Sequence, residues 1–446
     1  MNKKLMALAI AGVMAVPLTA VADGTHVTIF GRLQAEYATV DVDGFNAQTA
    51  VADDALQSRW GLQIAEDLGM GLQAIGRIEY NLNPGTGMGS GAREQWVGLR
   101  SDQWGELKFG RVQSVLRDFA GGHSIDPFAD TSLHATGSGG LMVSSANGYG
   151  SGDDGFVNSA IRFDSPVVEG FSVAALLMPG DADKYDPALG SLGSTDRGNF
   201  DAAVNTLNAN RWGGGNNLTL ANLGQAGSQK HSGGQNGEWD FQVGAKYSGQ
   251  FDNVGVDIFG AYSRDRTSKW ERRLWTAAAN DYLKDEQIWR GGATVTVEDF
   301  RLRGQYEYVF DANPFGGAAS CTSAAAFGDA VGSYTMDGGR GQCNSAMNPG
   351  GNGYLWMLGA DYTIGNTMLI AQGGMKRAKK TNNDDGISIF NKQNAENITV
   401  GVIHNLSRRS SLFGGYQRVW VNDKNRTAID GDADRNVYSV GIRHDF

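Results

Sequence analysis

Long segments of this chain alternate strictly between apolar and polar residues, and this alternation constrains the fold more than any other feature. In the segment 300–310, FRLRGQYEYVF, Leu302 and Tyr306 fall on one face while Arg303 and Glu307 fall on the other. The same period of two recurs at 239–248, 253–263 and 354–364. Successive side chains of a β-strand point to opposite faces of a sheet, so the pattern predicts strands with one apolar face.

A soluble β-sandwich and a membrane barrel can both produce such strands. The segments are about 10–13 residues long, against a mode of about 5–6 in globular proteins. Their apolar faces end in Tyr, Trp or Phe, as in the aromatic girdles of membrane barrels. After residue 22 no segment reaches the run of about 18 apolar residues that a membrane helix needs. These features favour the barrel.

The connections between segments alternate between short and long. Short ones lie at 66–71, 101–106, 164–170, 248–253, 297–300, 363–366 and 405–410, and long ones near 41–56, 82–92, 114–156, 179–236, 264–286, 312–352, 379–395 and 422–435. The pattern predicts an all-β, transmembrane antiparallel β-barrel of about sixteen strands, with short periplasmic turns and long extracellular loops. One misread pair would give fourteen. A barrel of sixteen strands is wide enough to hold an aqueous channel.

The chain ends in mid-strand. In NVYSVGIRHDF (436–446), Tyr438, Ile442 and Phe446 share one face up to the carboxylate. A closed barrel leaves no free edge, so we expect this strand to pair with the first one, near 25–37. Tyr438 and Phe446 are therefore candidates for barrel closure and assembly.

The first 22 residues have the composition of a secretory signal peptide: Lys3 and Lys4, an apolar stretch and a small-residue end at Ala20-Val21-Ala22. Cleavage after Ala22 would leave a single barrel domain at 23–446. Loss of the two lysines takes the formal charge from −10 to −12. With no basic stripe to bind phosphates, nucleic acid is excluded as a partner.

The segments VTIFGRLQAEY (27–37), SRWGLQIAEDLGMGLQA (58–74), REQWVGLRSDQWGELKFGRV (93–112) and NSAIRFDSP (158–166), with the terminal Phe446, resemble the general diffusion porins of Gram-negative outer membranes. The resemblance implies a sixteen-stranded barrel, usually a homotrimer, in an outer membrane of lipid and lipopolysaccharide. It also implies insertion by the barrel-assembly machinery, a third loop folded into the lumen, and passive diffusion of ions and small hydrophilic solutes without a cofactor.

By the same resemblance, the basic side of the pore constriction would comprise Arg59, Arg77, Arg111 and Arg162, with Arg32 and Arg93 as further candidates, and the acidic side Asp118, Asp126 and Asp130 of the third loop. Rings of charge at a narrow pore set ion selectivity. In the two-residue alternation Arg111 falls on the apolar face of its strand. It can therefore point inward only if the strand bulges or ends at Gly110. The acidic loop motif Pro-Glu-Phe-Gly-Gly of the family is replaced by Ile-Asp-Pro-Phe at 125–128.

Other patterns are weaker. Cys321 and Cys343, in one long loop of an exported chain, predict a disulfide. The acidic segment 430–436 lacks the Gly and Glu of an EF-hand, which leaves a loose divalent-cation contact or a solvated loop tip, and no metal site is predicted. No HExxH, GxSxG or Walker motif is present, which argues against an enzyme. A substrate-preferring channel, with the fourth long loop as a vestibule, stays open as an alternative, as does an adhesive barrel.

Overall fold

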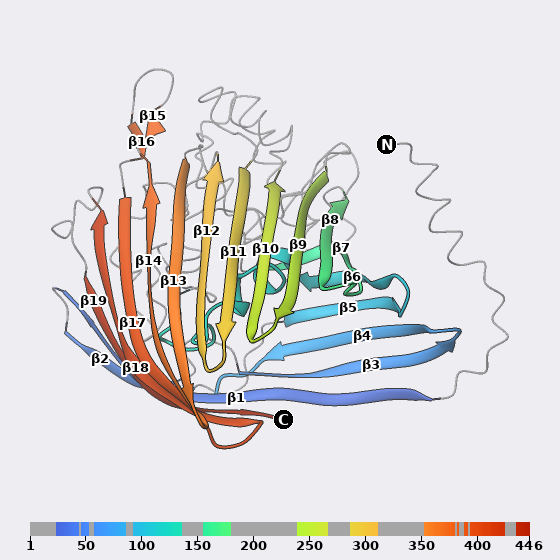
Figure 1. The fold of residues 1–446 in the computed structure, drawn as a ribbon, viewed down its shortest axis with the longest axis horizontal. Coiled ribbons are helices and arrows are strands. Elements are labelled where there is room, and N and C mark those ends of the chain that lie inside the picture. Colours follow the sequence, from blue (N-terminus) through green and yellow to red (C-terminus); the bar gives the residue numbers. More distant parts are fainter. Residues whose placement is uncertain are drawn as a thin grey trace, which may run out of the picture.

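The protein is represented by a computed structural model (Figure 1). It describes residues 24–43, 46–52, 58–85, 92–135, 155–179, 239–265, 286–310, 352–379, 381–382, 388–390, 393–423 and 434–446. The predicted signal peptide, both cysteines and most of the long loops, including the fourth, lie outside these residues.

Sixteen long strands build one closed antiparallel sheet. They are β1 (Thr25–Val42), β3 (Arg59–Gly69), β4 (Leu72–Asn81), β5 (Ala92–Ser101), β6 (Gly105–Gln113), β7 (Phe156–Asp164), β8 (Phe171–Pro179), β9 (Trp239–Phe251), β10 (Val254–Asp265), β11 (Glu286–Val297), β12 (Phe300–Phe310), β13 (Asn352–Ile364), β14 (Thr367–Ala378), β17 (Gln393–Asn405), β18 (Ser410–Asp423) and β19 (Arg435–Asp445). Each pairs with the next along the chain, and β19 returns to β1 (Figure 1). The predicted all-β barrel and its count of sixteen are confirmed, so the alternative of fourteen is wrong.

Three short strands were not predicted. β2 (Gln48–Ala52) pairs with Glu36–Val40 of β1, and β15 (Thr381–Asn382) pairs with β16 (Ser388–Phe390). All three lie within long connections of the sequence, where runs of two to five residues are too short for a period of two to be recognised.

The short turns use left-handed backbone, as tight hairpins require. Asp252 and Glu298, in the two-residue connections β9–β10 and β11–β12, have φ of 55° and 53°. Met70 and Gly71, between β3 and β4, have φ of 57° and 75°. This geometry matches the right-handed twist of the strands and lets neighbouring long strands pair over their whole length.

The barrel closes at the residue where the chain ends. The backbone N–H of Phe446 donates to the carbonyl of Gly31, and the N–H of Gly31 donates to the carbonyl of Phe446, both at 3.0 Å. A Cβ at Gly31 would lie 2.4 Å from the Phe446 ring, so the glycine provides the space for the terminal aromatic side chain. The predicted pairing of the last strand with the first is confirmed.

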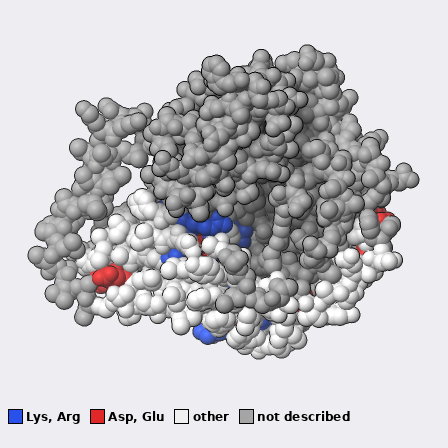
Figure 2. Space-filling model, turned by 180° about the vertical axis from the view of Figure 1, so that it is seen from behind, with Lys and Arg blue, Asp and Glu red and all other residues white. Residues whose placement is uncertain are grey.

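The wall is apolar outside and polar inside. On β12, Tyr306 is 49 % exposed and Leu302 42 %, whereas Arg303 and Glu307 are buried. Figure 2 agrees, since few charged side chains appear on the described part of the surface that it displays. Because charge at the lipid face is costly at mid-membrane, this division places the uncharged face toward the membrane.

The third long loop turns into the barrel. It leaves β6 through α2 (Val115–Asp118) and η1 (Gly122–Ser124) and is described as far as residue 135. Side chains of the opposite wall bind its backbone: Gln242 of β9 accepts from the Val115 N–H at 2.8 Å, and Gln417 of β18 donates to the Leu133 carbonyl at 3.1 Å. The loop therefore crosses the interior (Figure 1).

Candidate functional site

Three arginines of neighbouring strands surround one carboxylate on the inner wall. Glu79 of β4 contacts Arg77 of the same strand, Arg93 of β5 at 2.5 Å and Arg59 of β3 at 3.8 Å. The Glu79 side chain is 2 % exposed, while Arg59 and Arg77 are 22 % and 25 % exposed. Arg59 and Arg77 are therefore partly exposed, whereas the carboxylate that they share with Arg93 is buried.

A second carboxylate reaches this group through a bulge in β5. The pairs Ile78–Gln95 and Tyr80–Ala92 leave two residues of β5 opposite Glu79 alone. Such a bulge re-aims side chains, and here both Arg93 and Glu94 are buried inside the barrel. Glu94 contacts Arg77 at 2.9 Å.

The register shift expected at Gly110 is present. Gly110 has a φ of 133°, and the pairing with β7 shifts between Gly110 and Val112. Arg111 then donates to the carbonyl oxygens of Arg93 at 2.8 Å and Phe156 at 3.4 Å. Arg111 thus binds the wall at the base of the third loop.

Two of the predicted acids meet predicted arginines. Asp118, at the end of α2, pairs with Arg162 of β7 at 2.9 Å, and Arg162 also holds Asp164 at 2.7 Å. Asp130 pairs with Arg32 of β1. Each pair joins the third loop to the barrel wall.

Asp126 occupies a different place. Its carboxylate accepts from the backbone N–H groups of Phe128 at 2.8 Å and Ala135 at 2.6 Å, and from the Gln372 amide of β14 at 2.8 Å. These bonds shape the loop and fasten it to the wall. The turn at 126–135 directs its oxygens to the loop backbone and to β14, and a role for Asp126 on the acidic side of the constriction stays a prediction.

The two paired loop acids differ in their pKa values. Burial alone would raise the pKa of Asp130, but the bond and charge of His123 and the charges of Arg443 and Arg59 hold it well below 3.8. Burial raises the pKa of Asp118 above 3.8, and the charge of Arg162 opposes that rise. Asp118 therefore takes up a proton first as the pH falls.

Buried charged side chains of other strands also fasten the loop through its backbone. Arg290 of β11 is fully buried against Glu307 of β12 at 2.6 Å and donates to the Leu116 and Ala120 carbonyls of the loop, the latter at 3.2 Å. Glu36 of β1 accepts from the Ser132 N–H at 2.9 Å. Buried carbonyl and N–H groups of the loop are paired in this way.

Several of these residues were missed in the sequence, although the alternation could have found them. Glu79 lies two residues after Arg77, on the same strand face, and Arg443 lies opposite the apolar face of the last strand. Arg117, Arg290 and His123 carried no comparable signal, because their importance depends on where the third loop lies.

The predicted closure residues lie on the outside of the seam. Tyr438 is 52 % exposed and its ring centroid is 5.0 Å from that of Tyr416, and Phe446 is 41 % exposed. Inside the same seam, Arg32 donates to Asp445 at 2.6 Å. Arg32 therefore links the barrel closure to the third loop.

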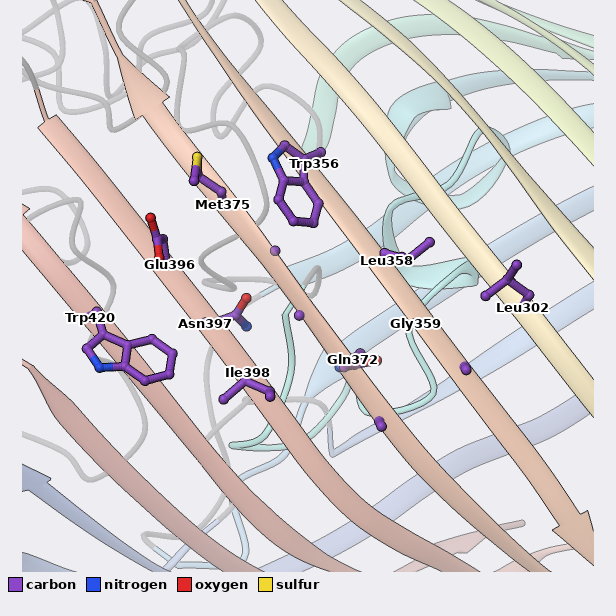
Figure 3. Close-up of a pocket in the computed structure, with 14 residues that line it drawn as sticks. Leu302, Trp356, Leu358, Gly359, Gln372, Met375, Glu396, Asn397, Ile398 and Trp420 are labelled. Atoms are coloured by element: carbon purple, nitrogen blue, oxygen red, sulfur yellow. The ribbon is translucent and has the colours of Figure 1, made fainter.

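A groove of about 460 Å³ lies on the outer face of β12, β13, β14, β17 and β18. Figure 3 shows Trp356 and Trp420 on its two sides, with Met375 and Glu396 between them. Its exposed apolar lining includes Leu302. The groove belongs to the membrane-facing surface and is separate from the constriction.

No helix in the described part of the chain is long and apolar enough to cross a membrane. Among the same residues, no cluster of His, Cys, Asp or Glu has the make-up of a metal site.

The family model described as Gram-negative porin matches residues 7–427. The chain belongs to the Gram-negative porin family. Among relatives, an outer membrane porin protein of Bordetella pertussis is 37 % identical over 125 residues, covering 23 % of this chain and 32 % of that protein. The major outer membrane protein P.IB of Neisseria sicca is 30 % identical over 221 residues, covering 48 % and 57 %. The matches thus span about a third and just over half of these two relatives.

One relative aligns along its whole length: the major outer membrane protein P.IA of Neisseria meningitidis serogroup C is 26 % identical over 475 residues, with both chains fully covered. The fold of this porin is similar to that of an anion-selective porin from Comamonas acidovorans, with a TM-score of 0.57, 17 % identity and coverage of 95 % and 100 %. A Salmonella typhi OmpF complex with daunomycin gives a TM-score of 0.55 at 14 % identity, covering 96 % and 100 %.

The family and the closed barrel together place this porin in the Gram-negative outer membrane. The family is one of porins.

Proposed function

We propose that this porin forms a water-filled channel for the passive diffusion of ions and small hydrophilic solutes. One observation carries the proposal: the third loop is fastened across the interior of a closed barrel, opposite a wall whose arginines are partly exposed. A loop held in this way narrows the lumen and leaves a charged passage beside it.

The test is conductance in a planar bilayer containing the purified, folded protein. We expect stepwise increases in current, and steps in threes if the porin is a homotrimer. A silent bilayer from protein that migrates as folded would contradict the channel.

At the constriction we propose a preference for anions. Arg59 and Arg77 expose guanidinium edges, while their partner Glu79 is almost completely buried. A solute ion therefore approaches Arg59 and Arg77 more closely than Glu79, and the interaction weakens with distance. The anion-selective porin of similar fold supports the same direction. A reversal potential in a salt gradient measures it.

A substrate-preferring channel is the alternative. Concentration-dependent block of the ion current by one small solute, with no block by a solute of equal size and charge, would favour it. Equal partition of both solutes would favour general diffusion.

For assembly, we propose export by a signal peptide at 1–22 and recognition of the last strand by the barrel-assembly machinery. Phe446 is the recognition candidate, because its exposed ring ends the strand that closes the barrel. Deletion of Phe446 should lower the yield of folded trimer in the outer membrane more than the conductance of each surviving channel. Mass spectrometry of the mature N-terminus tests cleavage after Ala22.

A further inference from the structure

Three arginines from three elements of the chain meet around one aromatic ring at the base of the third loop. The guanidinium carbons of Arg117, Arg93 and Arg111 lie 4.7, 5.0 and 5.4 Å from the centroid of the Phe156 ring. Arg93 comes from β5, Arg111 from β6 and Arg117 from α2. Phe156 is the first residue of β7, where the chain returns to the wall.

We propose that Phe156 is a specificity-determining residue of this porin. Its uncharged ring positions Arg93, Arg111 and Arg117, the three arginines that surround it. The proposal rests on the proposed channel function and deepens it. The face of an aromatic ring attracts cations through its quadrupole. It adds no negative charge, so the field of the arginines toward the lumen is preserved.

A ring is suited to this position because like charges converge there. Guanidinium groups that share one small volume repel one another. Arg93 already has the Glu79 carboxylate as a partner, and a further carboxylate at position 156 would cancel more of the field that acts on a passing anion. An aromatic ring relieves part of the repulsion and leaves the net charge of the group unchanged.

Backbone pairing and hydrogen bonds fix the positions of Phe156 and the arginines relative to one another. Phe156 pairs with Gln113, the last residue of β6, and the Gln113 side chain accepts from Arg117 at 3.1 Å. The Phe156 carbonyl accepts from Arg111 at 3.4 Å. Arg117 also contacts His123 of the third loop, whose Nε2 lies 3.1 Å from the guanidinium group. Replacing the ring would therefore change the position of Arg117 and, through its contact with His123, that of the third loop.

The experiment compares Phe156→Leu with Phe156→Trp and with Phe109→Leu. Phe109 lies on β6 with its side chain 39 % exposed on the outer face, so it is a matched loss of an aromatic side chain. Each protein is reconstituted in planar bilayers, and the reversal potential is measured in a tenfold gradient of potassium chloride. Single-channel conductance reports on the width of the constriction.

We expect Phe156→Leu to shift the anion-to-cation permeability ratio toward cations by about two- to threefold, the range in which one weak cation–π contact changes an equilibrium. Phe156→Trp should retain the wild-type ratio, and Phe109→Leu should leave it unchanged. In an Arg117→Gln background the leucine substitution should add little, because the ring then has lost the cation that it contacts most closely.

Two results would overturn the proposal. One is a wild-type ratio in Phe156→Leu with normal conductance. The other is an equal shift in Phe156→Leu and Phe156→Trp, which would show that the site responds to any change of shape. Failure of the channel function itself is distinguishable, because the wild-type protein would then conduct no current at all.

Discussion

Two parts of the barrel wall both have polar inner faces, but they contact the third loop through different groups. From β3 to β7 the wall carries Arg59, Arg77 and Arg93 around the buried Glu79, and Arg162 paired with the exposed Asp118 of the loop. From β9 to β19 the wall holds the loop with amides and with a buried Arg290–Glu307 pair. The comparison shows that one part sets the charge of the constriction and the other sets its position.

The largest effect is expected at the buried Arg290–Glu307 pair of the wall from β9 to β19. Arg290→Met removes the partner of Glu307, and both side chains are fully buried. Breaking a buried pair on one side costs about 3–5 kcal/mol. We expect a corresponding loss in the free energy of unfolding, measured with urea in lipid vesicles.

The control is Arg301→Met on the neighbouring strand. Arg301 is 35 % exposed, and its partner Asp361 also contacts Arg303. Asp361 is buried but keeps Arg303 as a partner when Arg301 is replaced, so the loss should be smaller than for Arg290→Met. Equal losses in Arg290→Met and Arg301→Met would contradict the distinction between a fastening pair and an ordinary wall pair.

The second effect concerns charge selection at the basic wall. Replacing Arg59 and Arg77 by Gln leaves Glu79 with fewer positive neighbours. At a distance of about 10 Å, one unit charge is worth roughly 0.4–1.7 kcal/mol for effective dielectric constants of about 80 to 20. We therefore expect the permeability ratio to shift toward cations by roughly 2- to 17-fold for each charge removed, read from the reversal potential.

Arg100→Gln is the matched control for that measurement. Arg100 pairs with Glu106 at 2.7 Å beside the short turn at 102–104, away from the third loop. Its loss should leave the ratio close to that of the wild type. A shift as large as that of the double variant would mean that selectivity depends on total charge and not on the constriction.

A smaller effect is expected from one fastening amide. Gln417→Leu removes the donors to the Leu133 and His134 carbonyls, at 3.1 and 3.0 Å, and leaves both acceptors buried. The cost is about 1–3 kcal/mol for an unpaired buried group. We expect more frequent current fluctuations and faster hydrogen exchange at 131–135, with little change in ion preference.

Gln95→Leu serves as its control, because the Gln95 amide contacts Tyr80 at 2.9 Å on the wall. Steady currents in Gln417→Leu, indistinguishable from those of Gln95→Leu, would show that this amide does not hold the loop.

The smallest effect is a change with pH. The raised pKa of Asp118 means that falling pH neutralises this acid before Asp130, whose pKa is lowered well below 3.8. Loss of the Asp118 charge makes the passage more positive, so anion preference should rise as the pH falls toward the ordinary carboxyl pKa of about 3.9, and the rise should begin above that value. Asp118→Asn should remove most of this dependence, whereas Asp130→Asn should keep it. The reversal potential at a series of pH values is the measurement, and the opposite assignment would contradict the order of protonation.

The strands could be predicted because their evidence is local. The alternation of FRLRGQYEYVF predicts which side chains face lipid and which face the interior. The short break between two alternating segments predicts a turn such as that at 298–299. The bulge at Gly110 could also be anticipated, since Arg111 has the parity of apolar neighbours. In each case the chemistry of a few consecutive residues is sufficient.

The constriction could be predicted only in part. Arg162 pairs with Asp118 and Arg32 with Asp130, so these predicted residues lie at the junction of the third loop with the wall. Asp126 is diverted to the loop backbone, since a carboxylate in a tight turn finds N–H donors close by.

What the sequence by itself determined is therefore the wall: its strand period, its inner and outer faces, and its closure at Phe446. What only the tertiary structure decided is the content of the lumen, including the route of the third loop, the burial of Glu79 behind its arginines and the meeting of Arg93, Arg111 and Arg117 at Phe156. The physical reason is distance along the chain. Strand faces follow from neighbours two residues apart, whereas a charged passage depends on groups that become neighbours after the barrel has closed.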